Sequence, residues 1–460
     1  MNNKAIISIA LSTLLLSSCG LFKNYQRPAD ISTEGIYGDA QSGDEKGLGD
    51  IQWREIFTDP QLQALIEKGL ANNTDMKNAD LKIQEVQYAL KCAKLAYIPS
   101  IYFNPSGTVN RPWDPYGRNE YSTGKTYSLP ATMSWQIGSI GSLRNARKKA
   151  EVNVLQLRNA KQAIQAALVA NIASMYYTLS SLDEQLALTV TTRDNWGKYL
   201  EMEKKLMEAG QANLAAVASI EATYYSISTS VVALHDNIRL IENSLGTILG
   251  ETAGHISRGA LSTFQSPAIL ATGAPISILS RRPDVKAAEL ELASAFYEKN
   301  IAASQFYPSL NISATGQFTN ALGASAINPG IMIGNAVANL SQPIFANGRI
   351  RAQYKISKAE MEVATNNFKQ AVIAAGNEVN TAMVELKGAE DQKELIGKQV
   401  TALQQALDAT QKLYALSSTN YLNVITAQNS LLSAQMSQIQ NRMEAINATI
   451  DLYQALGGGE

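Results

Sequence analysis

The sequence predicts a mainly α-helical chain that is internally duplicated and that also carries four β-strands suited to cross a membrane. Three observations predict this fold class. Proline is absent from residues 131–266 and from residues 344–460, a pattern typical of very long helices. The two halves match each other at offsets of 207 and 209 residues, which indicates a duplicated unit of about 200 residues. Four segments of about ten residues alternate apolar and polar side chains.

The long helices are expected to form one hairpin in each half. Gly141 aligns with Gly348 at the 207-residue offset, and each precedes a long segment without proline. From Gly348 to Ser417 a single helix would rise roughly 100 Å at about 1.5 Å per residue, which is longer than a globular core needs. The predicted repeats are residues 51–266, with a helical hairpin at about 143–250, and residues 267–460, with a helical hairpin at about 348–457.

Each repeat is also expected to contain shorter helices and then a β-hairpin, at about 100–137 in the first half and about 309–342 in the second. One side of these strands is apolar, and the other carries Ser, Thr, Asn and Gln with almost no charge. A half-buried sheet of a soluble protein would alternate in the same way, but the strand length and the uncharged polar side favour tilted membrane strands. Four strands cannot close a barrel, and an open edge in lipid would leave backbone groups unpaired. The strands are therefore expected to be completed by other copies of the chain.

The N-terminus predicts a lipoprotein signal at residues 1–18, with Lys4 before an apolar segment and Cys19 as the site of lipidation. An uncleaved anchor with an incidental cysteine is the alternative. Residues 19–50 follow as a lipid-anchored tail rich in Gly, Ser, Asp and Pro, which is expected to run along the outside of the body. Cys92 would be the sole thiol of the mature chain, which excludes an internal disulfide, and it is expected to be a small core residue. No later segment has 18 uninterrupted apolar residues.

Composition and motifs argue against several function classes. A net charge of −1 with 17% charged residues offers no basic surface for nucleic acid. The two histidines, His235 and His255, show no metal-ligand spacing, and the sequence has no phosphate-binding loop or nucleophile motif. Neither catalytic residues, nor a metal, nor a cofactor beyond the covalent lipid is therefore expected. The segment Arg281-Arg282-Pro283-Asp284 is interpreted as a loop that enters a helix, with its proline in the first turn and its aspartate favourable to the helix dipole.

Several segments together resemble the TolC-like family of outer-membrane factors, specifically the lipoprotein branch that serves resistance-nodulation-division efflux systems. The resemblance covers nearly all of the mature chain. It is carried by residues 53–66, by Ser280-Arg281-Arg282-Pro283-Asp284-Val285 with Glu289, by Tyr307-Pro308-Ser309, by Pro343-Ile344-Phe345 with Gly348-Arg349, and by Asn420, Tyr421, Leu422, Ala427 and Gln428.

This resemblance implies a homotrimer in which each chain gives four strands to a twelve-stranded trimeric β-barrel in the outer membrane. It implies that the helices form a long α-helical barrel that extends into the periplasm. The end of this tunnel would meet a periplasmic adaptor protein and, through it, an inner-membrane resistance-nodulation-division pump. A member of the family is not an enzyme, and it conducts small molecules passively.

Candidate site residues lie at the turns of the two helical hairpins, which are expected to be tips that contact the adaptor. After the second tip, the family closes its periplasmic aperture with a leucine, an aspartate and an arginine. Here Leu422 agrees, whereas Thr426 and Asn429 do not, so closure by apolar and polar packing is predicted in place of a charged gate. The expected tip residues are Gly210, Gln211, Asn213, Ser417, Ser418 and Asn420.

Other functions are compatible with part of this pattern. A duct for a type I protein-secretion system would use the same architecture. A lipid-anchored structural coiled-coil protein without a pore would explain the signal and the helices, but it would leave the uncharged strand faces and the duplication without a role. A lipoprotein enzyme is disfavoured because no catalytic constellation is present. Export of drugs, metals or other small molecules is favoured, with selectivity expected to lie largely in the pump.

Overall fold

The chain divides into two compact units, each assembled from separate stretches of sequence. The first unit takes its described residues from Met1–Ala29, Lys82–Leu157 and Ala288–Phe368, and the second takes them from Asp30–Leu81, Arg158–Ala287 and Lys369–Glu460. The computed structural model describes residues 22–28, 52–110, 124–139, 141–252, 254–264, 282–319, 331–416 and 421–458.

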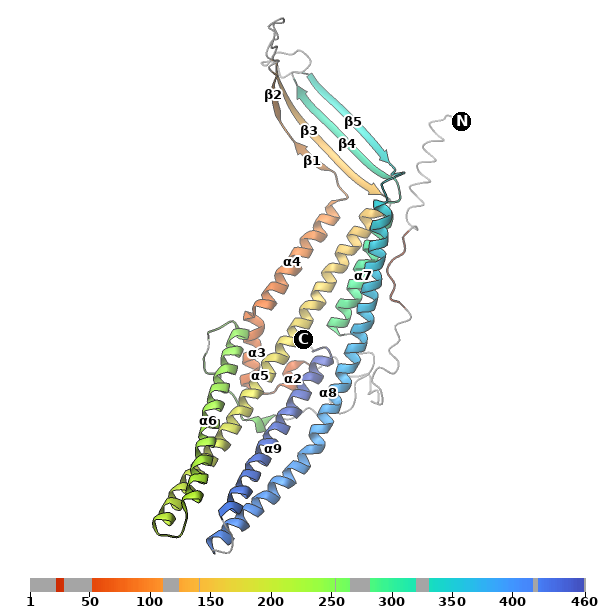
Figure 1. Ribbon diagram of the computed structural model, residues 1–460. Helices are drawn as coiled ribbons and strands as arrows, with labels where there is room; N and C mark the ends of the chain where they lie inside the picture. The colour runs from red at the N-terminus through yellow and green to blue at the C-terminus, as the bar shows by residue number, and fades with distance from the viewer. Residues whose placement is uncertain are drawn as a thin grey trace. The chain divides into compact units, whose positions relative to one another are not determined.

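The described residues are mostly helical and form one antiparallel sheet (Figure 1), so the predicted mainly α-helical fold with a small sheet is confirmed. Helices α5 and α8 each contribute to both units. The first half contains α2 (Trp53–Ile56), α3 (Pro60–Asn72), α4 (Thr74–Leu95), β1 (Ser100–Phe103), β2 (Ser106–Asn110), β3 (Gly124–Ser139), α5 (Ser142–Glu208) and α6 (Leu214–Leu249). The second half contains the short 3₁₀ helix η3 (Leu261–Thr263), α7 (Pro283–Ser304), β4 (Ser309–Thr319), β5 (Ile331–Ser341), α8 (Arg349–Ala415) and α9 (Tyr421–Ala455).

Helix bounds in the second half repeat those in the first. The ends of α5 and α8 are related by the 207-residue offset, and the ends of α4 and α7 are related by the 209-residue offset. Gly141 and Gly348, which directly precede α5 and α8, have φ values of 80° and 77°. Other residue types rarely adopt this left-handed conformation, so the paired glycines explain why both long helices begin where they do.

The sheet has the order β1-β3-β4-β5, and β2 also pairs with β3. The register places Met133 opposite Ala314 and Trp135 opposite Ile312, so one face is apolar. On the opposite face the hydroxyls of Thr132 and Thr315 lie 3.1 Å apart. The alternation read from the sequence is therefore preserved across the strands, apart from a bulge at Ile137 between the paired residues 136 and 138.

Two expectations for the first half are wrong. The first strand of the β-hairpin expected at about 100–137 is divided into β1 and β2, with Asn104 and Pro105 between them. Proline has no N–H to donate to a ladder, which accounts for an interruption at this position. Cys92 is exposed in the single chain and does not belong to a core, because the side of α4 that packs on the chain carries Ile83, Val86 and Leu90 instead.

The described part of the N-terminal tail, residues 22–28, lies against the helices of the first unit. The backbone N–H of Tyr25 donates to the hydroxyl of Tyr297 at 3.4 Å. The guanidinium of Arg27 lies 3.9 Å from Glu289 on α7 and 5.2 Å from the ring centroid of Phe368 on α8. This segment therefore joins α7 to α8. The remainder of the predicted tail, including Cys19, lies outside the described residues.

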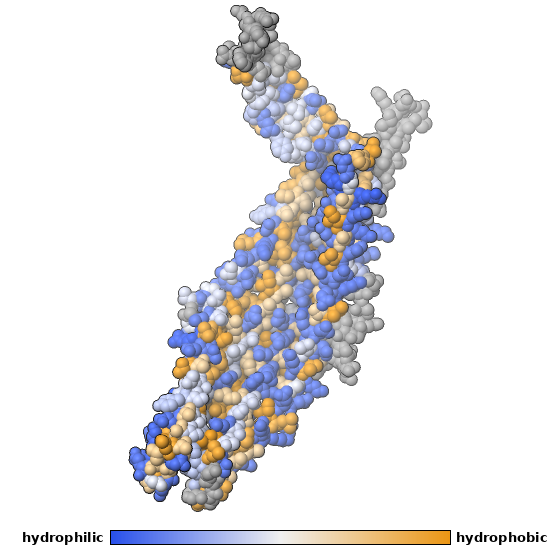
Figure 2. All heavy atoms as spheres, viewed as in Figure 1, coloured by the Kyte–Doolittle hydropathy of each residue, from blue (hydrophilic) through white to orange (hydrophobic). Residues whose placement is uncertain are grey.

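In the second unit, large apolar side chains on α2 and α3 are buried, among them Trp53, Leu62 and Ile66. Burial of this apolar surface fixes the short helices against the long ones. Polar and apolar residues are interspersed over the helices on the face shown in Figure 2. Among the described residues, no helix combines the length and the apolar character that a membrane-spanning helix requires.

Candidate functional site

The turn between α5 and α6 is the first of the two predicted tips. The chain reverses within residues 209–213, where Gly210 has a φ of 74° and its N–H donates to the carbonyl of Met207 at 3.0 Å. Asn213 then caps α6, because its side-chain oxygen accepts from the N–H of Ala216 at 2.9 Å. Gly210, Gln211 and Asn213 are all exposed. The local sequence therefore builds a short turn that presents small and polar groups.

The second tip lies between the end of α8 at Ala415 and the start of α9 at Tyr421. Its predicted adaptor-contacting residues, Ser417, Ser418 and Asn420, fall outside the described residues.

The predicted aperture residues form one exposed stripe on the first three turns of α9. Leu422, Thr426 and Asn429 follow the i, i+4, i+7 spacing of a helix face, and all three are exposed. Leu422 is 63% exposed. The hydroxyl of Thr426 donates to the backbone carbonyl of Leu422 at 2.9 Å. The stripe carries an apolar, a hydroxyl and an amide group, so no ion pair can form within it. The opposite side of the helix is buried through Val424 and Ile425.

An apolar cluster holds α9 against the first helical hairpin near these tips. Ile425 packs with Trp196 on α5 and with Val217, Ile220 and Ile227 on α6. Trp196 is 1% exposed and Ile220 is fully buried. The exposed stripe on α9 is therefore positioned by packing on the other side of the same helix.

Polar contacts join α8 to α5 in the same region. The hydroxyl of Tyr414 donates to Oε2 of the buried Glu203 at 3.0 Å. One helical turn earlier, the amide of Gln411 donates to the hydroxyl of Tyr199 at 2.7 Å. Burial and the hydrogen bond to Glu203 raise the pKa of Tyr414 to about 12, so the phenol is a donor at any physiological pH.

The ring of Tyr421, at the start of α9, meets that of Tyr414 edge to face with 6.1 Å between centroids. Burial also raises the pKa of Tyr421, and the negative charge of Glu203 adds to this effect. Tyrosines at helical spacing resemble ordinary core residues, so no signal in the sequence separated Tyr414 from them.

A polar groove of about 610 Å³ runs between α5, α8 and α9. Gln428 is only 8% exposed, and its Oε1 has no hydrogen-bond partner among the described residues. Such an amide is suited to accept a hydrogen bond from a group that enters the groove. The amide-bearing side chains of the lining are Asn195, Gln404, Gln411, Gln428 and Gln435.

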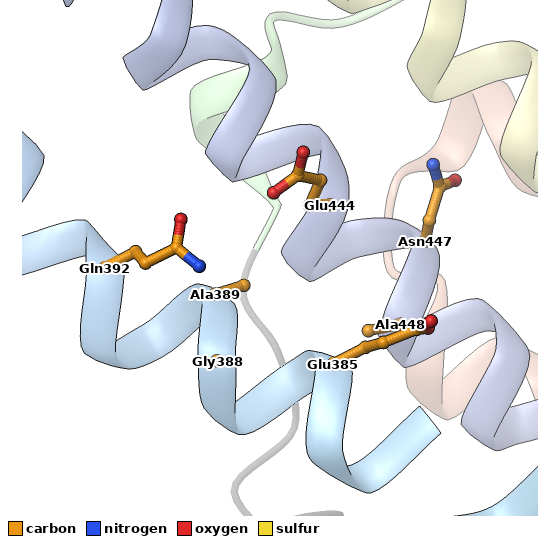
Figure 3. A pocket seen from close by; sticks show the side chains of 7 residues that line it. All are labelled: Glu385, Gly388, Ala389, Gln392, Glu444, Asn447 and Ala448. Atoms are coloured by element: carbon orange, nitrogen blue, oxygen red, sulfur yellow. The ribbon is translucent and has the colours of Figure 1, made fainter. Parts of the chain in front are cut away.

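Another cavity, of about 350 Å³, lies between α8 and α9 (Figure 3). Gly388 leaves space there because it has no side chain, and the carboxylates of Glu385 and Glu444 border it. Neither a histidine nor a cysteine joins these two carboxylates in the lining. Among the described residues, no group of three or more His, Cys, Asp or Glu side chains is placed to hold a metal ion.

Arg282 organises the junction of α7, α8 and α9 within the second unit. Its side chain is 5% exposed and makes ion pairs with Asp284 at 2.7 Å and with Glu378 at 2.6 Å. It also donates to the carbonyl of Ala455 at 2.8 Å. Burial would raise the pKa of Asp284, but the hydrogen bond and charge of Arg282 hold it below its ordinary value. Pro283 occupies the first turn of α7, as the sequence predicted.

Arg258 ties the segment after α6 to the long helices of the same unit. It pairs through Nε with Asp183 on α5 at 2.5 Å and through Nη1 with the buried Glu242 on α6 at 2.8 Å. Burial would raise the pKa of Glu242, but the hydrogen bonds from Arg258, the backbone of Ile256 and His255 hold it below its ordinary value. Both arginine networks link neighbouring helices of the second unit. The segment around Arg282 stood out in the sequence as the start of a helix, whereas no sequence motif marked Arg258.

Comparison with known families decides the class of protein to which this arrangement belongs. The model of the outer membrane efflux protein family matches residues 65–251 and residues 274–458, one match in each half of the chain. The chain belongs to the outer membrane efflux protein family. The resemblance inferred from the sequence motifs is therefore confirmed, and so is the outer-membrane location. The family consists of channel proteins.

Relatives of similar length support this assignment. The chain is 26% identical to the cation efflux system protein CusC of Escherichia coli over 460 residues, which cover 97% of both proteins. It is 26% identical to the toluene efflux pump outer membrane protein TtgC of Pseudomonas putida over 469 residues, which cover 99% of this chain and 96% of TtgC. The probable outer membrane lipoprotein SilC of Salmonella typhimurium is 23% identical over 457 residues, which cover 99% of this chain and 98% of SilC.

Solved structures show the same fold. The crystal structure of CusC matches with a TM-score of 0.84 at 24% identity and covers 96% of this chain and 100% of CusC. The structure of the Campylobacter jejuni CmeC outer membrane channel matches with a TM-score of 0.85 at 20% identity, and the match covers 96% of this chain and 95% of CmeC. The channel fold of the family therefore extends over almost the whole of this outer-membrane efflux protein.

Proposed function

We propose that this efflux protein is a homotrimeric duct. In this assembly three copies of the four-stranded sheet complete a twelve-stranded barrel in the outer membrane, and the long helices enclose a tunnel in the periplasm. The observation that carries the proposal is the pair of family matches, because each half of the chain carries a β-hairpin and a long helical hairpin. An apolar sheet face suits contact with lipid, and a face of uncharged polar groups suits a water-filled interior.

Cys19 is proposed as the lipidated residue that anchors the chain to the outer membrane. Residues 22–28 support this proposal, because they pack on α7 and α8 only three residues after Cys19. A lipid there would add a second attachment beside the barrel.

The tips are proposed to contact a periplasmic adaptor protein that links the duct to an inner-membrane resistance-nodulation-division pump. The exposed turn at Gly210, Gln211 and Asn213 supports this role, and so does the polar groove lined by Gln411 and Gln428. The duct itself would conduct small molecules passively. Because CusC is named for cation efflux and TtgC for toluene efflux, ions and small organic compounds are the proposed substrate classes.

Electron microscopy of the detergent-extracted protein tests this proposal. The expected result is a hollow particle with threefold symmetry, with tunnel walls formed by helices of about 100 Å at 1.5 Å per residue. A monomer or a solid rod would overturn it. Deletion of the gene in its host distinguishes efflux from the alternative function, protein secretion. Efflux predicts accumulation of small toxic compounds with unchanged secretion, whereas a type I secretion duct predicts the reverse.

A further inference from the structure

Positive charge is concentrated where the two long helices begin. Residues 142–150, at the start of α5, contain four Lys or Arg side chains and no Asp or Glu, and the same is true of residues 349–359, at the start of α8. Arg144 aligns with Arg351 at the 207-residue offset. The whole chain is nearly balanced, with 39 Lys and Arg against 40 Asp and Glu, so these segments are local excesses of positive charge.

This charge opposes the dipoles of both helices. The N-terminus of a helix carries a partial positive charge, so acidic side chains are favourable there and basic ones are unfavourable. Neither α5 nor α8 has an acidic residue in its first turn, whereas Arg144 lies in that of α5, and Arg349 and Arg351 lie in that of α8. A negative charge from outside the helices would offset this cost.

Carboxylates of the chain already compensate much of the positive charge at the start of α5. Glu151 pairs with Arg147 at 2.8 Å and with Lys148 at 3.0 Å. Glu298 on α7 pairs with Lys149 at 2.7 Å. The start of α5 therefore has less need of an external anion.

The start of α8 lacks such compensation. Arg349, Arg351 and Lys355 are exposed, and in the described part of the chain they make no ion pair with a carboxylate. The first ion pair along this helix joins Lys358 to Glu362 at 3.8 Å. The three preceding residues, Arg349, Arg351 and Lys355, form the basic patch.

The basic patch lies just beyond the end of the sheet. β5 ends at Ser341, eight residues before α8 begins (Figure 1). The patch occupies about the first 9 Å of α8, at 1.5 Å per residue. Long basic side chains can extend from such a position to a membrane surface while their aliphatic stems stay against the helix.

The N-terminal tail approaches the start of the other long helix. Nη2 of Arg144 on α5 donates to Oδ1 of Asn24 at 3.3 Å. Asn24 is five residues after Cys19, and five extended residues span at most about 18 Å. The proposed lipid anchor therefore lies near the start of α5, which agrees with a membrane surface at the level where the long helices begin.

We propose that the basic patch binds the phosphate groups of anionic phospholipids, such as phosphatidylglycerol, in the inner leaflet of the outer membrane. This inference rests on the proposed duct, which places the sheet in that membrane and the long helices below it. Arg349 and Arg351 can each present two parallel N–H groups to phosphate oxygens, and Lys355 adds a compact positive charge. The bound phosphates supply the negative charge that the first turn of α8 lacks.

Native mass spectrometry in detergent micelles doped with equal amounts of phosphatidylglycerol and phosphatidylethanolamine tests the site. The wild type should retain phosphatidylglycerol in preference. Replacing Arg349, Arg351 and Lys355 together by Gln should lower the relative affinity for phosphatidylglycerol roughly a hundredfold, at about 1 kcal/mol for each basic residue near an anionic surface. Lys355→Gln alone should lower it roughly fivefold, which keeps the test decisive if the triple variant does not assemble.

Two further variants distinguish lipid binding from a structural role and from a general charge effect. The charge-conserving combination Arg349→Lys, Arg351→Lys and Lys355→Arg should keep most of the preference for phosphatidylglycerol. Replacing three other exposed lysines of α8 by Gln is the matched control, because it removes equal charge at least about 57 Å from Arg349, at 1.5 Å per residue. This control should bind lipid as the wild type does. Its lysines are Lys387, Lys393 and Lys412.

The mass of the assembly, measured in the same spectra, separates this inference from the proposed duct. A trimer that retains both lipids equally, or a control that loses as much preference as the patch variant, would overturn the lipid site and leave the duct intact. A wild-type monomer would overturn both. Inorganic phosphate at millimolar concentration should displace little phosphatidylglycerol. Full displacement would overturn the lipid assignment and give the patch to a soluble anion.

Discussion

Tyr414 on α8 donates its hydroxyl hydrogen to Oε2 of Glu203 on α5 at a distance of 3.0 Å, and the carboxylate is almost fully buried. Tyr414→Phe keeps the ring but leaves this carboxylate without its phenolic partner. Removing one partner of a buried hydrogen bond costs about 1–3 kcal/mol. We therefore expect faster hydrogen exchange and faster proteolysis in the helices flanking both tips, together with a lower midpoint of unfolding.

Tyr225→Phe is the matched control for this substitution. Tyr225 is on α6 in the same unit, but it is 61% exposed, so loss of its hydroxyl should change neither exchange nor proteolysis at the tips. Equal effects of the two substitutions would show that the Tyr414 hydroxyl makes no specific contribution to the stability of the helices near the tips.

The helix bounds could be predicted from the sequence because local residues set them. Helix ends depend on nearby residues, such as Gly141 and Gly348 before the long helices and Pro283 in the first turn of α7. Because these residues recur at fixed offsets, an alignment of the two halves predicted equivalent helix bounds in both. The break at Pro105 was missed because the period-two pattern continues through it.

Long-range contacts could not be predicted in this way. Tyr414 and Glu203 are 211 positions apart, and nothing in the sequence around either residue indicates the other. Arg258 is likewise paired with Asp183 across 75 positions. For Cys92 the apolar neighbours suggested a core, but Ile83, Val86 and Leu90 form the side of α4 that packs on the chain, and Cys92 lies outside that side.

The paired glycines before the long helices permit a comparison within one protein. Gly348 has a φ of 77°, and the described residues leave open space where an added Cβ would lie, whereas a Cβ on Gly141 would lie 2.6 Å from Cδ2 of Phe22. Gly348→Ala should lower the free energy of unfolding by about 1–2 kcal/mol, because alanine would have to adopt a left-handed conformation. Gly141→Ala should cost more, because it must also displace the ring of Phe22.

Thermal unfolding in detergent measures this difference, and limited proteolysis reports release of residues 22–28 in the Gly141 variant alone. Gly397→Ala is the control, because this glycine lies inside α8 with open space and alanine favours a helix. Equal destabilisation by Gly141→Ala and Gly348→Ala would argue against a role for the Phe22 contact.

Acid stability should depend on Glu242. Its folded-state pKa lies below the ordinary value of 4.5, so the carboxylate binds protons more readily in the unfolded chain. The stabilisation of the folded state by the ionised Glu242 is therefore complete well above pH 4.5. It is lost as the pH falls through the lower folded-state pKa. Glu242→Gln should lower the unfolding midpoint at pH 7 and reduce the decline of that midpoint between pH 5 and pH 3.

Differential scanning calorimetry across that pH range tests this linkage. Glu251→Gln is the control, because Glu251 pairs with Lys68 at a site where both side chains are 43% exposed and solvent screens the charges. An unchanged pH slope in Glu242→Gln would show that other carboxylates govern acid unfolding.

Leu422 should narrow the proposed duct at its periplasmic end. Its side chain is 63% exposed at the start of α9, and the two other residues of the stripe, Thr426 and Asn429, carry no charge. If three copies bring this stripe together, Leu422→Ala should raise single-channel conductance in planar bilayers by removing apolar side chains from the constriction. Leu395→Ala, which shortens a 66% exposed leucine on α8, should leave conductance unchanged.

Salt should alter the conductance ratio of variant to wild type very little, because the closure lacks an ion pair. An unchanged conductance in Leu422→Ala would place the constriction elsewhere, and a strong dependence of this ratio on salt would contradict closure by uncharged packing.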